Sequence, residues 1–113
     1  MDFKSFASAL TKIEKIPLPG HFGHKGLVPR PDHIRWAGVL CLFFPDAQGL
    51  VHFVLIRRQK SKGPHSGQVA FPGGRKDPED NTMGDTALRE CEEEIGVPRS
   101  SIKLFKAMSE LYI

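Results

Sequence analysis

The first apolar residues of the chain recur with the spacing of one helical face. They are Phe3, Phe6, Ala7, Leu10 and Ile13. This spacing predicts a short amphipathic helix that ends near Lys15. A Pro- and Gly-rich passage from Pro17 to Pro31 follows, and such residues favour loops over regular structure. We therefore expect an N-terminal helix and lead-in over residues 1–34, ahead of a single domain over residues 35–113.

Two runs of aromatic and β-branched residues come next, from Trp36 to Phe44 and from Val51 to Arg57. The stretch between them, from Pro45 to Gly49, is rich in turn-forming residues. Two such runs on either side of a turn predict a β-hairpin. We expect this hairpin to lie at the centre of a sheet.

The rest of the chain combines short extended runs with one strong helix. A strand is predicted from Gln68 to Phe71, and it leads directly into Gly73 and Gly74. A helical pattern runs from about Met83 to Ile95, and alternation from Ile102 to Ile113 predicts a further strand. This mixture of helices and strands predicts a domain of the α/β class.

Three carboxylates fall together on one face of the second predicted helix. At about 100° per residue, Glu90, Glu93 and Glu94 lie within an arc of roughly 100°, whereas Glu92 points away. Carboxylates at this spacing repel one another and destabilise a helix, unless a hard divalent cation removes the repulsion. Oxygen ligands suit Mg²⁺ or Mn²⁺ rather than Zn²⁺. We interpret this face as a metal site, and the alternative for any Glu-rich helix is a solvated charged face.

The residues around these carboxylates resemble the Nudix box, the family pattern G-x5-E-x7-R-E-U-x-E-E-x-G-U, in which U is a bulky aliphatic residue. The matching positions are Arg89, Glu90, Glu93, Glu94, Gly96 and Val97. Asp80 stands where the family has Glu, eight residues rather than seven separate it from Arg89, and Cys91 takes an aliphatic position. The extra residue falls before the helix, where Asn81 or Thr82 can cap the first turn.

This resemblance, with a box over about residues 74–97, implies an α/β Nudix fold in which a mixed β-sheet lies between α-helices. It implies a bound Mg²⁺ or Mn²⁺, with Glu90, Glu93, Glu94 and a backbone carbonyl of Gly73 as ligands. The catalytic residues that it implies are Glu93, Arg89, Glu90 and Glu94. Arg89 is expected to orient an acid, either Asp80 or Glu79, rather than to bind substrate. The general base stays open at this point.

A second stretch resembles the signature of the coenzyme A pyrophosphatase branch of this family, roughly L-L-T-x-R-S-x3-R-x3-G-x3-F-P-G-G. Arg58, Gly67 and the run from Phe71 to Gly74 match it, whereas Gln59 and Gly63 replace a Ser and a second Arg. The substrate-binding residues that this resemblance implies are Arg58, Gly67, Gly73, Gly74 and Arg75. The implied reaction is hydrolysis of coenzyme A or an acyl-CoA to 3′,5′-ADP and a 4′-phosphopantetheine.

Two other functions stay open at this level. The missing second Arg favours a Nudix hydrolase for another substrate, such as ADP-ribose or a nucleoside triphosphate. Asp80 and the altered spacing favour a Nudix-fold binding module without turnover. The three intact carboxylates argue against such a module, since a protein without catalysis has little reason to keep them clustered.

Composition and charge limit the partners. A net charge of +3 over 113 residues is mild, so we expect no nucleic-acid partner. Six basic residues bracket the glycine turn, and they are Arg57, Arg58, Lys60, Lys62, Arg75 and Lys76. This arrangement fits a small polyanion, which agrees with a nucleotide substrate. No run approaches the roughly 20 apolar residues that a membrane-spanning helix needs, so we expect no membrane partner.

The two cysteines, Cys41 and Cys91, are too few for a disulfide framework, and both lie within apolar segments. We expect both to be buried free thiols in a reducing compartment, which indicates the cytoplasm.

The end of the chain, at Ile113, stops on the last predicted strand. The resembled family continues with further strands and a closing helix, so we expect an incomplete domain. An unfinished sheet leaves unpaired backbone groups and uncovered apolar surface, which favours pairing with a second copy. We therefore expect a homo-oligomer.

Overall fold

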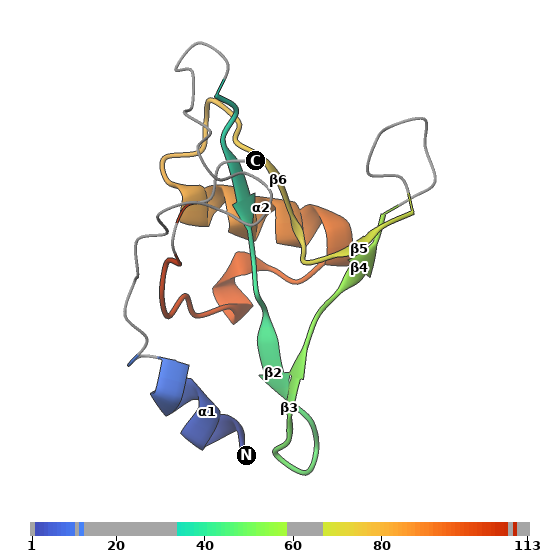
Figure 1. Cartoon of the computed structure of the whole chain (residues 1–113), viewed down its shortest axis with the longest axis vertical. Coiled ribbons are helices and arrows are strands. Elements are labelled where there is room, and N and C mark those ends of the chain that lie inside the picture. The colour runs from blue at the N-terminus through green and yellow to red at the C-terminus, as the bar shows by residue number, and fades with distance from the viewer. Residues whose placement is uncertain (1, 11, 13–33, 59–66, 109, 111–113) are drawn as a thin grey trace, which may run out of the picture.

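The computed structural model of the chain (Figure 1) describes residues 2–10, 12, 34–58, 67–108 and 110. The helices are α1 (Phe3–Leu10), α2 (Met83–Ile95) and the 3₁₀ helix η2 (Arg99–Ser101). The strands are β1 (Ala37–Val39), β2 (Phe43–Pro45), β3 (Val51–Phe53), β4 (Ile56–Arg57), β5 (Val69–Ala70) and β6 (Gly73–Arg75). This content confirms the expected α/β class, and every named strand pair within the described ranges is antiparallel.

The six strands form three extended segments that pair with one another at their ends. β1 pairs with β6, β2 with β3, and β4 with β5. Backbone hydrogen bonds extend two of these ladders, since Leu40 N–H donates to the Pro72 carbonyl (2.8 Å) and Val54 N–H donates to the Leu42 carbonyl (3.0 Å). The ribbon therefore outlines a triangle, with α2 running across the corner where β1 pairs with β6 (Figure 1).

The predicted hairpin is confirmed as β2–β3, and its turn is closed by one aspartate. Its expected place at the centre of a sheet is wrong for the described residues, where β2 and β3 pair only with each other. Asp46 N–H donates to the Leu50 carbonyl (2.9 Å). In return, Asp46 Oδ1 accepts from the backbone N–H groups of Gln48 (2.8 Å) and Leu50 (2.9 Å). Gly49 has a φ of 81°, a left-handed conformation that glycine adopts without strain. The turn chemistry predicted for this stretch is thus what fixes the hairpin register.

Helix α2 lies directly against the β1–β6 ladder because two glycines face it. Gly38 and Gly74 are directly opposite each other in the ladder, so a side chain at either position would lie on the same face of it. A Cβ atom at Gly38 would lie 2.7 Å from the Met83 carbonyl oxygen and 3.0 Å from the Ala87 nitrogen. A Cβ atom at Gly74 would overlap the carboxyl group of Glu90. The absence of both side chains sets the distance between helix and strands.

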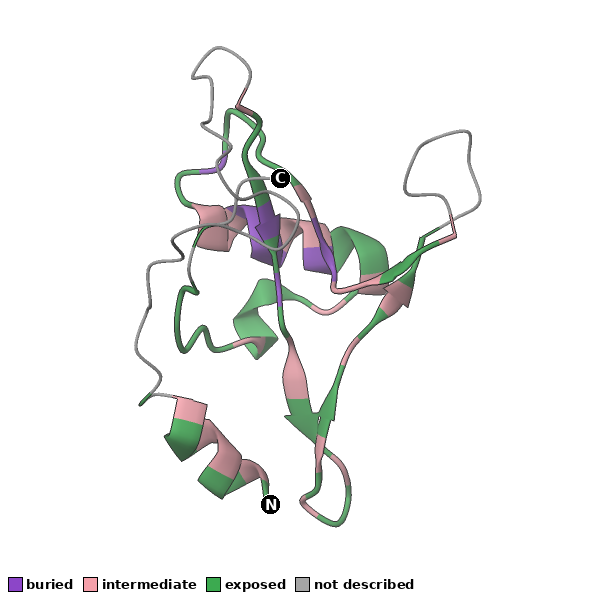
Figure 2. Ribbon diagram, viewed as in Figure 1, coloured by how far each residue is buried: buried purple, intermediate pink, exposed green. Residues whose placement is uncertain are grey.

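The core of the described residues lies between α2 and the extended segment that follows β1 (Figure 2). Its buried apolar residues are Leu40, Ala87, Leu88 and Cys91, and the partly buried residues packed on them are Leu42, Ile95 and Ile102. The helix predicted from Met83 to Ile95 is confirmed, and its apolar residues face this core.

The predicted N-terminal helix is confirmed over Phe3–Leu10, and its continuation from Ile13 to Lys15 lies outside the described residues. Four aromatic rings run in a row from α1 across the hairpin toward β6. They are Phe6, Phe43, Phe53 and Phe71, with neighbouring ring centroids 4.7, 6.3 and 6.2 Å apart. The Phe3 N–H also donates to the Gly49 carbonyl (3.0 Å). These contacts attach α1 to the hairpin.

The strand predicted from Ile102 to Ile113 is wrong for residues 102–108 and 110, which form no strand, and the remaining positions lie outside the described residues. Of the large apolar side chains in this segment, Leu104, Phe105 and Met108 are exposed. Ile102 packs on the core. Leu104 comes close to α2, since its Cδ1 would lie 3.1 Å from a Cβ placed at Gly84.

The prediction that both thiols are buried is wrong for Cys41, which is exposed, and right for Cys91. Successive side chains of an extended segment point to opposite faces. Leu40 and Leu42 turn toward the core, so Cys41 between them turns away from it. A continuous apolar run in the sequence conceals this alternation.

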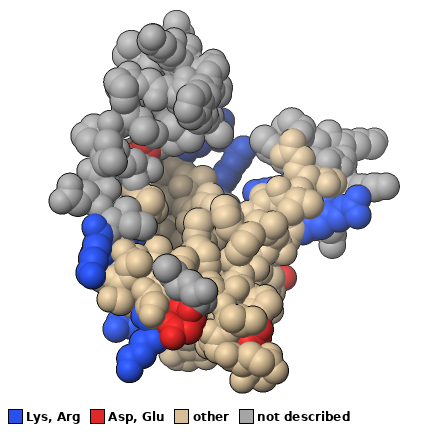
Figure 3. All heavy atoms as spheres, turned by 60° about the horizontal axis from the view of Figure 1, so that its bottom comes forward, with Lys and Arg blue, Asp and Glu red and all other residues tan. Residues whose placement is uncertain are grey.

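Large apolar side chains are also exposed on the hairpin, among them Phe44, Leu50 and Phe53. When the end of the molecule that carries α1 and the hairpin is turned forward, most of the described surface is uncharged, with basic side chains toward its edges (Figure 3). No helix among the described residues is long and apolar enough to cross a membrane.

Replacing Gly38 by Ala should destabilise the chain. The added methyl group would meet backbone atoms of α2, which cannot rotate away. We expect a loss of about 1–3 kcal/mol in the free energy of unfolding, the usual range for overpacking. Urea unfolding followed by circular dichroism at 222 nm measures this loss.

The matched control is Gly84→Ala, on the helix side. There the new methyl group would meet the mobile end of Leu104, and alanine is favoured over glycine in a helix by up to about 1 kcal/mol. This variant should be as stable as the unmodified chain or slightly more stable. If Gly38→Ala unfolds at the same urea concentration as Gly84→Ala, the proposed close contact between backbones is wrong.

Candidate active site

Helix α2 begins and ends at well-defined caps. Thr82 is the N-cap, and its Oγ1 accepts from the Asp85 N–H (3.0 Å), while Asp85 Oδ2 accepts from the Thr82 N–H (3.2 Å). This reciprocal arrangement is a capping box. At the other end, Gly96 has a φ of 75° and its N–H donates to the Glu92 carbonyl (2.9 Å). The caps fix which residues of α2 face the strands, and of the two caps predicted for the first turn, Thr82 is confirmed.

Arg89 on α2 joins the helix to the preceding loop and to β6. Its Nη2 donates to Asp80 Oδ2 (2.9 Å), and its Nε lies 3.1 Å from Asp80 Oδ1, so guanidinium and carboxylate meet side by side. The same Nη2 donates to the carbonyl of Arg75 (2.9 Å). Of the two acids expected as its partner, Asp80 occupies this position, whereas Glu79 is exposed.

The surroundings of Asp80 keep it charged. Besides Arg89, the carboxylate oxygen Oδ2 accepts from the Asp77 N–H (2.9 Å) and from Thr86 Oγ1 (2.9 Å). The hydrogen bonds from Arg89, followed by the one from the Asp77 backbone, hold the pKa of Asp80 well below its usual range. The hydrogen bond to Asp80, followed by those to Glu93 and Glu90, in turn raises the pKa of Arg89. This ion pair therefore stays charged across the physiological pH range.

The other guanidinium nitrogen of Arg89 faces two of the predicted metal ligands. Nη1 lies 3.1 Å from Glu90 Oε1 and 3.3 Å from Glu93 Oε1, and Asp77 Oδ2 lies 3.5 Å away. The third predicted ligand, Glu94, accepts from the Gly73 N–H through its Oε1 (3.1 Å). Glu90 and Glu93 thus share one nitrogen of Arg89, whereas Glu94 is held by the backbone of β6.

The candidate metal ligands at this edge suit a hard divalent cation, since all of them are carboxylate or carbonyl oxygens. The Glu90 carboxylate occupies the space that a side chain at Gly74 would fill, so the glycine gives the carboxylate access to the strand. Glu93 has a 59% exposed side chain, and its carboxylate is paired with Arg89. Among the described residues, no three His, Cys, Asp or Glu side chains gather as a ready-made metal site.

The residues predicted to bind substrate divide into two groups. Gly73, Gly74 and Arg75 form β6, beside the acidic residues of α2. Arg58 and Gly67 lie at the β4–β5 corner, where the Arg58 N–H donates to the Gln68 carbonyl (2.8 Å) and Gly67 has a φ of 75°. The side chains of Arg58 and Arg75 are both exposed. The predicted contributors Lys60 and Lys62 lie outside the described residues.

Two side chains near Arg89 were missed from the sequence. Asp77 lies close to the guanidinium, and Thr86 is fully buried with its hydroxyl on Asp80. The available signal for Thr86 was its position, since it lies four residues before Glu90 and therefore on the same face of α2. No comparable signal marks Asp77, because its approach depends on the conformation of the loop.

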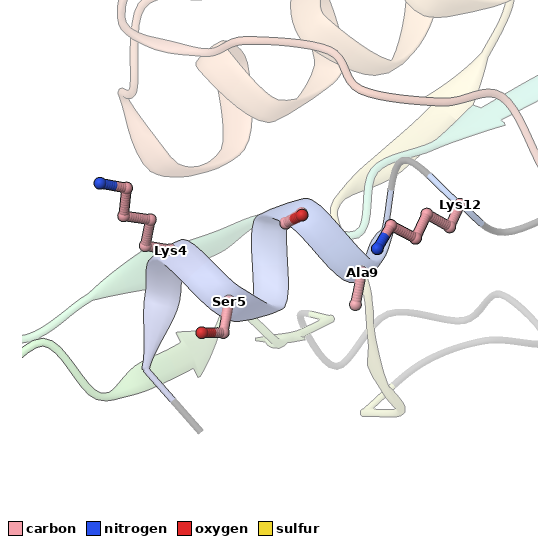
Figure 4. Close-up of a pocket in the computed structure, with 5 residues that line it drawn as sticks. Lys4, Ser5, Ala9 and Lys12 are labelled. Atoms are coloured by element: carbon pink, nitrogen blue, oxygen red, sulfur yellow. The ribbon is translucent and has the colours of Figure 1, made fainter.

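A shallow hollow runs along the outer side of α1, away from these residues (Figure 4). It is lined by Lys4, Ser5, Ser8, Ala9 and Lys12. All of these belong to α1 or follow it directly, and none is a predicted site residue. The hollow is not part of the candidate active site.

Comparison with known proteins agrees with this geometry. The model of the NUDIX domain family matches residues 34–112. The chain is 45% identical over 58 residues to a protein of Yersinia enterocolitica (serotype O:8 / biotype 1B) named as an uncharacterized Nudix hydrolase, NudL, and the match covers 51% of this chain and 30% of that protein. Proteins of the same name from Yersinia pestis (strain Pestoides F) and Yersinia pseudotuberculosis (serotype O:1b) are also 45% identical over 58 residues, with 51% and 29% coverage.

The chain thus matches less than a third of the length of these relatives. No solved structure matches it. The NUDIX domain match covers well over half of the chain, and it includes α2 and the glycine strand that faces it. The chain therefore belongs to the Nudix family.

Proposed function

We propose that this chain carries the metal-binding part of a Mg²⁺- or Mn²⁺-dependent hydrolase that cleaves the diphosphate of coenzyme A or an acyl-CoA. The products are 3′,5′-ADP and a 4′-phosphopantetheine. The observation that supports this proposal best is the contact of Glu90 with Gly74 and of Glu94 with Gly73, beside the Arg89–Asp80 pair. It sets oxygen ligands against a strand edge that a diphosphate can approach closely.

In this proposal Glu90, Glu93 and Glu94 hold the cation, together with the backbone carbonyl of Gly73. When bound, such a cation neutralises charge on the diphosphate and lowers the pKa of a water molecule. Arg89 limits how far Glu90 and Glu93 can separate, because one nitrogen contacts both. Its other nitrogens are anchored on Asp80 and are therefore not available to bind substrate.

The coenzyme A substrate is proposed from the signature residues before the box. Arg58 and Gly67 lie together at the β4–β5 corner, and the run from Phe71 to Gly74 connects this corner to the metal ligands. An exposed arginine at the corner is suited to the 3′-phosphate of coenzyme A, which ADP-ribose and nucleoside triphosphates lack. A role as a Nudix-fold binding module without turnover would leave the same residues bound to ligand but release no product.

The acidic face of α2 can be tested by charge removal. Glu93→Gln keeps the size of the side chain but removes a proposed metal ligand, so we expect turnover to fall by two or more orders of magnitude while the fold stays intact. Release of 3′,5′-ADP from coenzyme A with Mg²⁺ measures turnover, and circular dichroism measures the fold.

The matched control is Glu92→Gln, one position earlier on the helix. Glu92 is exposed and is not a proposed ligand, so its replacement should change turnover by less than about twofold. Equal losses in the two variants, or no loss in either, would show that the assignment of this helical face is wrong. Absence of product from the unmodified chain with every nucleotide tried would favour the binding module.

The proposed substrate can be tested with coenzyme A analogues. If Arg58 contacts the 3′-phosphate, a substrate without this phosphate should have a kcat/KM lower by about tenfold or more, since a charge-assisted contact contributes roughly 1.5–3 kcal/mol. ADP-ribose should also be a poor substrate. Steady-state rates with coenzyme A, dephospho-coenzyme A and ADP-ribose give the comparison.

The control for this test is Arg58→Gln. It should lower kcat/KM for coenzyme A toward the value for the dephospho form and change the dephospho form little. Equal kcat/KM for all three substrates would contradict the coenzyme A proposal and leave Nudix hydrolysis of another substrate in place.

A further inference from the structure

Thr86 is a polar residue in the buried face of α2. Its side chain is 0% exposed, and its Oγ1 lies 2.9 Å from Asp80 Oδ2 and 3.4 Å from the carbonyl of Thr82. A threonine within a helix commonly turns its hydroxyl to the carbonyl four residues earlier. Here the shorter contact is with Asp80, so the single hydroxyl hydrogen is directed to that carboxylate.

Asp80 is itself buried, with 8% of its surface exposed. A buried carboxylate is stable only when its oxygens accept hydrogen bonds. The loop supplies one donor, the Asp77 N–H, and α2 supplies two, Thr86 and Arg89. Thr86 therefore holds the carboxylate from α2 while the Asp77 N–H holds it from the loop, and together they fix the carboxylate to which Arg89 binds.

We propose that Thr86 is a positioning residue that holds Asp80, and through it directs Arg89 toward Glu90 and Glu93. The positioning rests on geometry alone, whereas its effect on metal binding rests on the proposed function. The proposal also accounts for the acid at position 80. A shorter side chain on a loop with one extra residue places its carboxylate where both the loop N–H and the Thr86 hydroxyl can reach it.

The same geometry makes Asp80→Glu a damaging change, although glutamate is the residue of the family pattern. The additional methylene would move the carboxylate by about 1.5 Å. All three donors to Asp80 Oδ2 lie at 2.9 Å, so a displaced carboxylate cannot keep them together. Glutamate at this position should therefore hold Arg89 less firmly than aspartate does.

The test uses Thr86→Val and Thr86→Ser. Valine has the shape of threonine without the hydroxyl, and serine keeps the hydroxyl. Hydrogen exchange at the Arg89 Nε–H, observed by NMR in the full 113-residue chain without added metal, reports how firmly the guanidinium is held. We expect exchange to be about tenfold faster or more in Thr86→Val and in Asp80→Glu, and near the original rate in Thr86→Ser.

Two results would overturn the proposal. One is an Arg89 Nε–H that exchanges in Thr86→Val at the rate of the unmodified chain. The other is an equal acceleration at the backbone amides of α2, which would show that the hydroxyl stabilises the helix as a whole. If Thr86→Val fails to fold, hydrogen exchange at the Arg89 Nε–H in Asp80→Glu provides the test, because this variant leaves Thr86 in place. An exchange rate equal to that of the unmodified chain would then overturn the proposal.

The dissociation constant for Mn²⁺, measured by electron paramagnetic resonance, separates this inference from the proposed function. Thr86→Val should weaken Mn²⁺ binding severalfold and Thr86→Ser should not, with Glu93→Gln as the reference for loss of a ligand. Unchanged Mn²⁺ binding in Glu93→Gln would contradict the proposed metal face. Hydrogen exchange at the Arg89 Nε–H would still decide the role of Thr86. If Glu93→Gln binds Mn²⁺ more weakly and Thr86→Val binds it as tightly as the unmodified chain does, the link from Thr86 to the metal ligands is wrong.

Discussion

The close contact between α2 and the β1–β6 ladder determines the geometry of the whole acidic group. Without side chains at Gly38 and Gly74, the helix backbone lies against the strand backbone. At that distance a glutamate carboxylate reaches the strand edge, and an arginine reaches a strand carbonyl. A wider separation would remove these contacts together, since each spans the same interface. Packing and site chemistry therefore depend on a single feature of the fold.

Charge balance is the second condition. Arg89 has four acidic neighbours, Asp77, Asp80, Glu90 and Glu93. One guanidinium cannot neutralise them all, so the group carries a net negative charge that favours a cation near β6. The lowered pKa of Asp80 and the raised pKa of Arg89 keep this pair charged near neutral pH. The basic residues at positions 57, 58, 75 and 76 lie outside this group.

The helix and its caps could be predicted from the sequence because they rest on contacts between residues close in the chain, and its buried face could be predicted from the spacing of its apolar residues. The partner of Arg89 could be narrowed to two acids for the same reason. The role of Gly38 could not be predicted, because it depends on a helix distant in sequence. The role of Thr86 could not be predicted either, because it depends on where the loop before α2 places Asp80. The segment after Ile102 shows a further limit: alternating apolar residues suit a strand, but they serve equally to pack an extended chain on a helix.

The opposite environments of the two thiols separate their chemical reactivity. Desolvation raises the pKa of both thiols, but the Cys91 side chain on α2 is fully enclosed, so a reagent can reach it only when the core opens. Cys41 is exposed on the segment between β1 and β2. A thiol-specific spin label would therefore attach at one position in the native chain without any mutation. A paramagnetic ion bound near β6 could then be located by its distance from that label.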